Sequence, residues 1–203
     1  MKLYFSPASP YVRKVVVTAH EKGVADRIEL LSSAASPVNR DKTIVRSNPS
    51  GKVPTMLLDS GEALYDSRVI CAYVDAQGEG ASLRPQGVAG FSDMTLEALG
   101  DAILDAALLA RYETVARPKE LYWGAWYDGQ IEKIDSGLDA LLDVWLDRLS
   151  GPVTPGVISA ACALGYLDFR FPDKDWRTGR EKLAAWFEAF EKRPSMQATM
   201  PKG

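Results

Sequence analysis

Near the start of the chain, a serine followed by proline marks the junction between a short apolar segment and a helical pattern. Residues 2–6 predict a strand, and apolar residues recur at helical spacing after Pro10. Ser9 therefore places a hydroxyl at a helix start, where backbone N–H groups are unpaired and the helix dipole favours an anion. The chemistry to consider is stabilisation of an anion by that hydroxyl. The alternative is capping alone, the common use of Ser-Pro at this position.

A second segment with chemical potential runs from Asn48 to Thr55, with the sequence NPSGKVPT. In it, Pro54 opens a predicted strand, although an interior strand rarely accepts a residue that donates no hydrogen bond. A cis Val53–Pro54 bond would turn the Val53 backbone outward, where it could pair with an extended peptide. The alternative is an ordinary proline on an edge strand.

The third segment is Asp66-Ser67, which follows a strand-turn-strand pattern over 55–64 and precedes a predicted helix. Both residues are good helix caps, which is one interpretation. In the other, Asp66 accepts a hydrogen bond from a ligand ammonium, while Ser67 and the helix-start amides hold a carboxylate. Such a pair suits the amino-acid end of a ligand.

The first 80 or so residues predict the order strand, helix, strand, helix, strand, strand, helix, with the second strand at 28–31. In this order and spacing, the three segments resemble the thioredoxin-like domain of a cytosolic glutathione S-transferase of the bacterial, Ser-containing type. The resemblance covers residues 1–78. It implies an α/β domain of βαβαββα topology that binds glutathione.

The rest of the chain predicts a second, all-helical domain over 91–203, after a Gly/Pro-rich linker at 77–90. The segment 161–172 resembles the buried helix of bacterial members of the same family. The expected fold class is thus α/β plus all-α, a thioredoxin-like domain followed by a helical bundle.

One departure from the family pattern concerns the start of the buried helix, where the family has a Ser/Thr cap with Asp three residues on. Here Thr154 has Val157 three residues on. We therefore expect the helix start to be less stable by about 0.5–1 kcal/mol unless another group compensates. We also expect Val157→Asp to raise the melting midpoint.

Length and charge agree with this interpretation. The chain has 203 residues, 46% of them hydrophobic, with a formal net charge of −3 and no long basic run, which argues against nucleic acid as a partner. There is no signal-peptide pattern and no stretch of 18 apolar residues, so no membrane segment and a cytoplasmic location are expected.

Cysteine and histidine usage predicts neither a disulfide nor a metal site. Cys71 and Cys162 each lie within an apolar helical pattern, as expected of buried free thiols in a reducing compartment. His20 is the one histidine, and no Cys or His cluster has the spacing of metal ligands.

The resemblance implies that the task of the site is to hold the thiol of glutathione as its thiolate, the reactive nucleophile. Members with a Ser-Pro-aromatic start place the active hydroxyl at the position of Ser9, which is the expected catalytic residue. Ser6 is the second candidate. Tyr4 and Tyr11 also lie near this turn, where packing is the expected role of both.

The resemblance also assigns the contacts to glutathione. The Val53 backbone would pair with the cysteinyl part, Pro54 would keep that geometry, and Asp66 and Ser67 would hold the γ-glutamyl end. Lys52 matches a residue that reaches the glycyl carboxylate in Ser-type members, and a solvated turn lysine is the alternative.

The implied function is conjugation of glutathione to a small apolar electrophile, with detoxification as the role, or a related peroxidase, dehalogenation or isomerisation step. A glutathione-binding or interaction module without turnover is the alternative. Thiol-disulfide exchange is not expected, because serine cannot form a mixed disulfide. The electrophile is expected beside the first long helix of the second domain. A homodimer is also implied, with contacts at Tyr65, Arg68 and the helix over 92–117.

Overall fold

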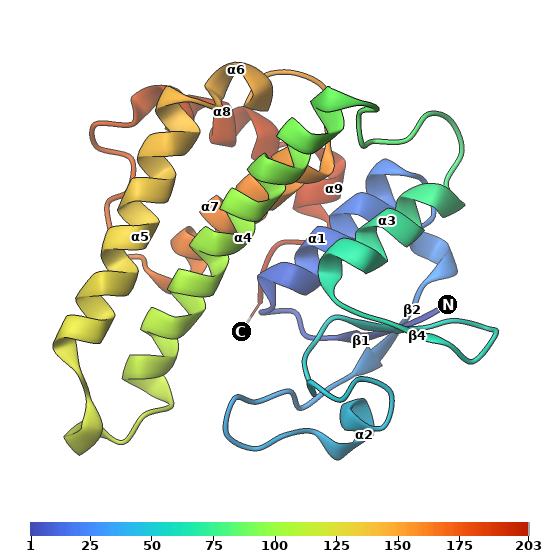
Figure 1. The fold of residues 1–203 in the computed structure, drawn as a ribbon, viewed down its shortest axis with the longest axis horizontal. Coiled ribbons are helices and arrows are strands. Elements are labelled where there is room, and N and C mark those ends of the chain that lie inside the picture. Colours follow the sequence, from blue (N-terminus) through green and yellow to red (C-terminus); the bar gives the residue numbers. More distant parts are fainter. Residues whose placement is uncertain (203) are drawn as a thin grey trace. The chain divides into compact units, whose positions relative to one another are not determined.

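The computed structural model describes residues 1–202, which form two compact units (Figure 1). The first unit contains Met1–Leu83 together with the C-terminal segment that begins at Pro194. The second contains Arg84–Arg193. The predicted second domain ran from 91 to 203, so the structure differs in assigning the last residues to the first unit.

The first unit is built on a four-stranded sheet with the strand order β2-β1-β3-β4. Strand β1 pairs in parallel with β2 and antiparallel with β3, and β3 pairs antiparallel with β4. The bounds are Lys2–Phe5 for β1, Glu29–Ser32 for β2, Thr55–Leu57 for β3 and Ala63–Leu64 for β4.

Two helices of the first unit, α1 and α3, bury their apolar faces together with the central strands. Helix α1 spans Pro10–Glu21 and α3 spans Ser67–Gln77, while α2 (Lys42–Val45) and a 3-10 turn, η1 (Ala25–Arg27), are short connections. Their shared core contains Leu3, Val12, Val15, Met56, Ile70 and Val74, each at most 1% exposed. The predicted βαβαββα order is confirmed.

The C-terminal segment packs on α1 through polar contacts that the sequence pattern does not reveal. Arg13 is buried, and its guanidinium donates to the carbonyl of Met196 at 3.2 Å, at the short helix α9 (Pro194–Gln197). The hydroxyl of Ser195 donates to the carboxylate of Glu21. A buried guanidinium needs acceptors, and here residues from the far end of the chain provide them.

The second unit is all-helical, as predicted. It contains α4 (Val88–Val115), η2 (Lys119–Leu121), α5 (Gly124–Asp143), α6 (Leu146–Leu149), α7 (Pro155–Arg170) and α8 (Glu181–Glu191). Helix α7 is its centre, because every residue from 155 to 167 is buried. Gly100 of α4 lets the helices approach closely, since a Cβ there would lie 2.8 Å from the backbone carbon of Ser159.

The start of α7 is supported by a carboxylate from another helix, in place of a capping box formed by its own residues. Thr154 is the N-cap and accepts a hydrogen bond from the Val157 N–H at 3.3 Å. The carboxylate of Asp93, on α4, accepts from the Gly156 N–H at 3.3 Å and from the Thr154 hydroxyl. The compensating group that the sequence prediction allowed for is therefore an aspartate 61 residues away.

Both cysteines are buried and neither forms a disulfide, as predicted. Among the helices formed by residues 1–202, none combines the length and the apolar run that crossing a membrane requires.

Candidate active site

The topology of the first unit brings the three predicted segments to one edge of the sheet. Strands β1 and β4 both run antiparallel to β3, so they point the same way, and α1 and α3 begin just beyond their ends. Strand β3 starts at this same edge, because Thr55 lies opposite Tyr4 in the register. The helix starts at Ser9 and Asp66 therefore flank the loop that ends at Pro54.

Ser9 is the N-cap of α1, as the capping interpretation predicted. Its oxygen accepts a hydrogen bond from the Val12 N–H at 3.3 Å, and its own N–H donates to the carbonyl of Ser6 at 3.1 Å. The cap uses the oxygen only as an acceptor, so the hydroxyl hydrogen stays available for an anion. Capping and anion stabilisation are thus compatible in this geometry.

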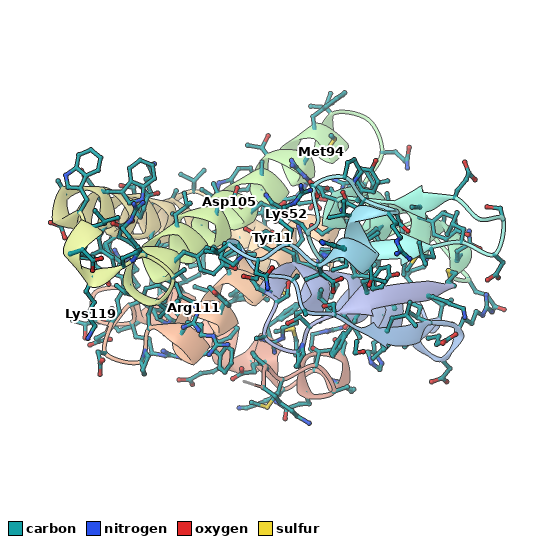
Figure 2. All side chains as sticks on the ribbon, turned by 90° about the horizontal axis from the view of Figure 1, so that it is seen from below. Tyr11, Lys52, Met94, Asp105, Arg111 and Lys119 are labelled. Carbon is teal, nitrogen blue, oxygen red and sulfur yellow. The ribbon has the colours of Figure 1, made fainter. Side chains whose placement is uncertain are left out.

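The other hydroxyls near this turn are placed differently. Tyr4 is buried in β1 at 8% exposure, and Ser6 lies half-buried just after that strand. Tyr11 is half-buried in the first turn of α1 (Figure 2). Neither Ser6 nor Tyr4 lies within the first turn of a helix, so Ser9 is better placed to act together with the helix dipole.

Asn48 organises the loop that precedes β3. Its side-chain amide donates to the Thr55 hydroxyl at 2.8 Å, and its oxygen accepts from the N–H and hydroxyl of Ser50 at 2.9 and 2.7 Å. The Thr55 hydroxyl in turn donates to the carbonyl of Lys52 at 2.8 Å. Asn48 is 1% exposed, so this polar residue supports the loop from the inside. Sequence reasoning named the segment but assigned no role to Asn48.

Within this loop the Val53–Pro54 peptide is cis, the first of the two possibilities that the sequence left open. Val53 is half-buried and Pro54 is buried. Within residues 1–202, the backbone N–H and C=O of Val53 form no hydrogen bond. Backbone N–H and C=O groups inside folded proteins are nearly always paired. The two unpaired groups of Val53 are therefore available to an extended ligand.

At the start of α3, Asp66 is the N-cap and Ser67 is the first helical residue. The Asp66 carboxylate accepts from the Arg68 N–H at 3.0 Å and forms an ion pair with the Arg68 guanidinium at 3.3 Å. Asp66 and Arg68 are more than half exposed at their side chains, whereas Ser67 is 3% exposed. Such an exposed ion pair contributes little free energy, so a ligand ammonium can compete for the carboxylate.

Lys52 is exposed at the end of the same loop (Figure 2). Its carbonyl is held by Asn48 and Thr55, while its ammonium extends into solvent. Together the edge offers a hydroxyl at one helix start, free backbone groups, a carboxylate at a second helix start and a lysine. These groups can bind a peptide-like ligand that has an ammonium, carboxylates and a thiolate.

Among the described residues, no group of three His, Cys, Asp or Glu side chains has the arrangement of a metal site.

The second unit contains the helix that the sequence predicted beside the electrophile. On α4, Ile103, Leu104 and Ala107 are buried, and Ile103 faces Gly137 of α5. Leu108, Arg111 and Tyr112, on the same helix, are half-buried. Asp101 accepts a hydrogen bond from the Ser159 hydroxyl at 2.9 Å inside the bundle, which is a structural role.

Comparison with known proteins adds independent information. Residues 8–77 match the glutathione S-transferase N-terminal domain model, and residues 124–189 match the glutathione S-transferase C-terminal domain model. The chain is 33% identical to the uncharacterized GST-like protein YibF of Escherichia coli (strain K12), over 99% of this chain and 98% of that protein.

Solved structures of family members resemble the whole chain, as two examples illustrate. A glutathione transferase family member from Pseudomonas fluorescens Pf-5, with bound glutathione, is 47% identical with a TM-score of 0.97, covering 100% of this chain and 99% of the other. A structure of a family member from the same source, with bound S-(propanoic acid)-glutathione, is 46% identical with a TM-score of 0.93 and covers 100% of both chains.

Proposed function

Because this chain belongs to the glutathione S-transferase family, we propose that it is a transferase that binds glutathione at the sheet edge of its first unit and activates the thiol through Ser9. The observation that carries the proposal is the hydrogen bond from the Val12 N–H to the Ser9 oxygen. That bond orients the hydroxyl at the start of α1 while leaving its hydrogen free to be donated to sulfur.

The chemistry requires a thiolate at neutral pH, where a thiol with a pKa near 8.5 is mostly protonated. A hydrogen bond from the Ser9 hydroxyl and the dipole of α1 both favour the anion. Together we expect them to lower the thiol pKa of bound glutathione by about one to two units, or roughly 1.4–2.7 kcal/mol. The sulfur then gives an electron pair to the electrophilic carbon, and a leaving group departs or a double bond takes up a proton.

Recognition of glutathione uses the rest of the edge. The Val53 N–H and C=O pair with the cysteinyl backbone, and Pro54 keeps this part of the loop in place. Asp66 accepts the γ-glutamyl ammonium, while Ser67 and the amides at the start of α3 hold the adjoining carboxylate. Lys52 pairs with the glycyl carboxylate. Glutathione in a relative that is 47% identical supports this ligand for the present chain.

The second substrate is a small electrophile whose carbon body packs on apolar side chains. A relative binds S-(propanoic acid)-glutathione, a glutathione with a substituent on its sulfur. This ligand supports conjugation, in which the sulfur gains such a substituent. Peroxidase, dehalogenase and isomerase steps would use the same activated thiolate.

The decisive experiment is a pH titration of the thiolate absorbance of bound glutathione. For the parent protein we expect a thiol pKa below the free value, and for Ser9→Ala a value close to that of free glutathione. Ser6→Ala is the matched control, because it removes a hydroxyl from the same turn, and it should behave as the parent.

The other outcomes are equally informative. A lowered pKa that survives in Ser9→Ala but is lost in Ser6→Ala would move the catalytic role to Ser6. Binding with an unchanged thiol pKa would favour a glutathione-binding module without turnover. Absence of binding would limit the relationship to the fold.

A further inference from the structure

The first helix carries a buried arginine one turn after Ser9. Arg13 is 5% exposed, and its backbone N–H donates to the Ser9 carbonyl at 3.0 Å. Residues four apart lie on the same face of a helix, and helical side chains tilt toward the N-terminus. The Arg13 side chain therefore lies on the face of α1 that begins at Ser9.

The guanidinium of Arg13 is held by neutral acceptors. Its Nη2 donates to the Met196 carbonyl at 3.2 Å, and its Nε donates to the Thr199 hydroxyl at 3.4 Å. Within residues 1–202, the buried Nη1 has no hydrogen-bond partner and no carboxylate forms an ion pair with Arg13. Because a guanidinium in a protein stays charged, its positive charge has no counter-charge in contact with it.

The C-terminal segment brings these acceptors to the start of α1. Helix α9 lies beside α1 (Figure 1), and the Ser195 hydroxyl donates to Glu21 in the last turn of α1. At the other end, the Lys202 N–H donates to the Pro7 carbonyl at 3.3 Å, in the turn before the helix. Three residues reach at most about 10 Å, so the contact of the guanidinium with Thr199 lies near that turn.

The charged groups around α1 leave the charge of Arg13 uncancelled. Glu21, the acidic residue of α1, follows Arg13 by eight residues, or about 12 Å along the helix axis. The other residues on α1, α3 and the C-terminal segment that carry or can gain a charge near neutral pH are Lys14, His20, Asp66, Arg68, Asp75 and Lys202. The carboxylates among them form ion pairs with other cations, Asp66 with Arg68 and Asp75 with Lys22.

This placement of a charge costs stability. A cation near a helix N-terminus is repelled by the helix dipole, and a buried charge without a counter-charge is costly. Anchoring of the C-terminal segment would not by itself require a charge, because neutral amide donors can bond to the same acceptors. The arrangement favours an anion at the start of α1, which is where the proposed function has a thiolate.

We propose that Arg13 assists the transferase reaction without contacting the substrate, because its buried charge stabilises the thiolate of glutathione at the start of α1. The C-terminal segment holds the guanidinium there through acceptors that do not neutralise it. This inference rests on the proposed function, and the residues that carry it all belong to the first unit. A unit charge about 10 Å from the sulfur changes the thiol pKa by about 0.3–1.2, for an effective dielectric constant between about 20 and 80.

The test measures the thiol pKa of bound glutathione from its thiolate absorbance. Arg13→Gln keeps donors for the same acceptors but removes the charge, so we expect a thiol pKa at least about 0.3 above that of the parent. Arg13→Lys keeps the charge but loses the planar set of donors, and it should give a value close to that of the parent. A purely structural role would not produce this order, because both variants lose contacts of the guanidinium.

A matched control and a second variant complete the test. Arg27 is exposed in the same unit and also donates to a backbone carbonyl, that of Gln77 at 3.2 Å, so Arg27→Gln should leave the thiol pKa unchanged. Thr199→Asp leaves Arg13 in place and gives it a counter-charge. It should keep or raise the melting midpoint and still raise the thiol pKa, because the charge near the thiolate is neutralised. This variant decides the question if Arg13→Gln does not fold.

A thiol pKa that is unchanged in Arg13→Gln and in Thr199→Asp, while Ser9→Ala raises it, would overturn the inference and leave the proposed function in place. Equal increases in Arg13→Gln and Arg13→Lys would also overturn it, since the contacts and not the charge would then be responsible. If the parent does not bind glutathione, or binds it without a lowered thiol pKa, thiol activation through Ser9 fails and the inference fails with it.

Discussion

At the residue scale, the hydroxyl of Ser9 illustrates how one side chain serves both structure and chemistry. As an N-cap it satisfies the Val12 N–H, which is worth about 1 kcal/mol to the helix. A hydroxyl has two lone pairs and one hydrogen, so this use leaves the donor function intact. The two interpretations that the sequence left open are therefore not exclusive.

Asp66 carries a prediction at the same scale. Asp66→Ala removes the proposed acceptor for the γ-glutamyl ammonium, and the affinity for glutathione should fall about 10-fold or more, as loss of a charge-assisted hydrogen bond implies. Calorimetric titration measures this affinity. Glu62→Ala, at an exposed carboxylate of the same unit, is the control and should leave the affinity unchanged. An unchanged affinity in Asp66→Ala would count decisively against this site.

At the element scale, helix α7 depends on a residue of another helix for its start. Asp93 accepts hydrogen bonds from Thr154 and Gly156 and forms an ion pair with Arg84 at 3.3 Å, while it is itself fully buried. Burial is the main cause that raises its pKa, and the hydrogen bonds counteract part of that effect. Packing of α4 on α7 thus brings an acceptor to the start of α7 from outside the local sequence.

Asp93→Ala should therefore destabilise the protein more than loss of an ordinary cap. Two buried donors lose their acceptor and Arg84 keeps its second partner, Glu97, so we expect a loss of about 3 kcal/mol in the free energy of unfolding. The measurement is the thermal melting midpoint of Asp93→Ala beside that of Thr95→Ala. Thr95 is exposed, and its hydroxyl contacts only its own helix. A variant as stable as Thr95→Ala would contradict this role.

The same contacts change the outcome expected for Val157→Asp. The sequence alone predicted a higher melting midpoint, because an acid at this position would complete the capping box. Val157 is fully buried and Asp93 already accepts from the Gly156 N–H and the Thr154 hydroxyl, so a second carboxylate at position 157 would be buried beside an existing one. The midpoint should fall, and a rise on melting would show that Asp93 does not satisfy the helix start.

Asp75 connects three elements of the first unit and predicts a pH dependence. Burial raises its pKa, but hydrogen bonds from Ser82 and Leu83 and the Lys22 ammonium at 3.3 Å lower it more, to a net value below 3.8. A carboxyl that is more acidic when folded stabilises the protein at pH values above 3.8, and this contribution is lost as the pH falls through the folded pKa.

Asp75→Asn should lower the free energy of unfolding by about 2 kcal/mol at pH 7, because Lys22 keeps its charge without its partner. The difference from the parent should shrink as the pH falls below 3.8. Urea unfolding at pH 7 and pH 3 measures both effects, with Asp26→Asn as the exposed control. A difference that is the same at both pH values would contradict the assignment.

At the scale of the whole molecule, we propose a homodimer, as the family resemblance implies. Each unit exposes apolar side chains near the segments predicted for the contact. Tyr65 and Val69 are 42% and 48% exposed in the first unit, and Phe91 and Met94 are 71% and 52% exposed on α4. Contiguous patches of exposed apolar side chains mark protein interfaces, so these residues are the ones to test for a contact.

The mass in solution tests this proposal. Light scattering should give a dimer for the parent and a monomer for Phe91→Glu, because burying a charge in an apolar contact is costly. Leu121→Glu is the matched control, since Leu121 is 59% exposed on η2 and lies outside the predicted contact. A monomeric mass for the parent protein would contradict the proposed homodimer.

The sequence by itself determined the local features of this protein. Period-2 and helical patterns predicted the strand and helix order, and Ser9, Val53–Pro54 and Asp66–Ser67 marked the three segments of the candidate site. Such features depend on neighbouring residues, so they can be read along the chain.

Only the tertiary structure decided which distant groups meet. The pairing of β1, β3 and β4 brings two helix starts to one sheet edge, and the C-terminal segment provides acceptors to the buried Arg13. Asp93 reaches the start of α7, and the Ser159 hydroxyl of α7 donates to the carbonyl of Glu97 on α4. These contacts join residues far apart in sequence. They are selected by close packing and by the need to pair buried polar groups, and neither requirement leaves a periodic pattern along the chain.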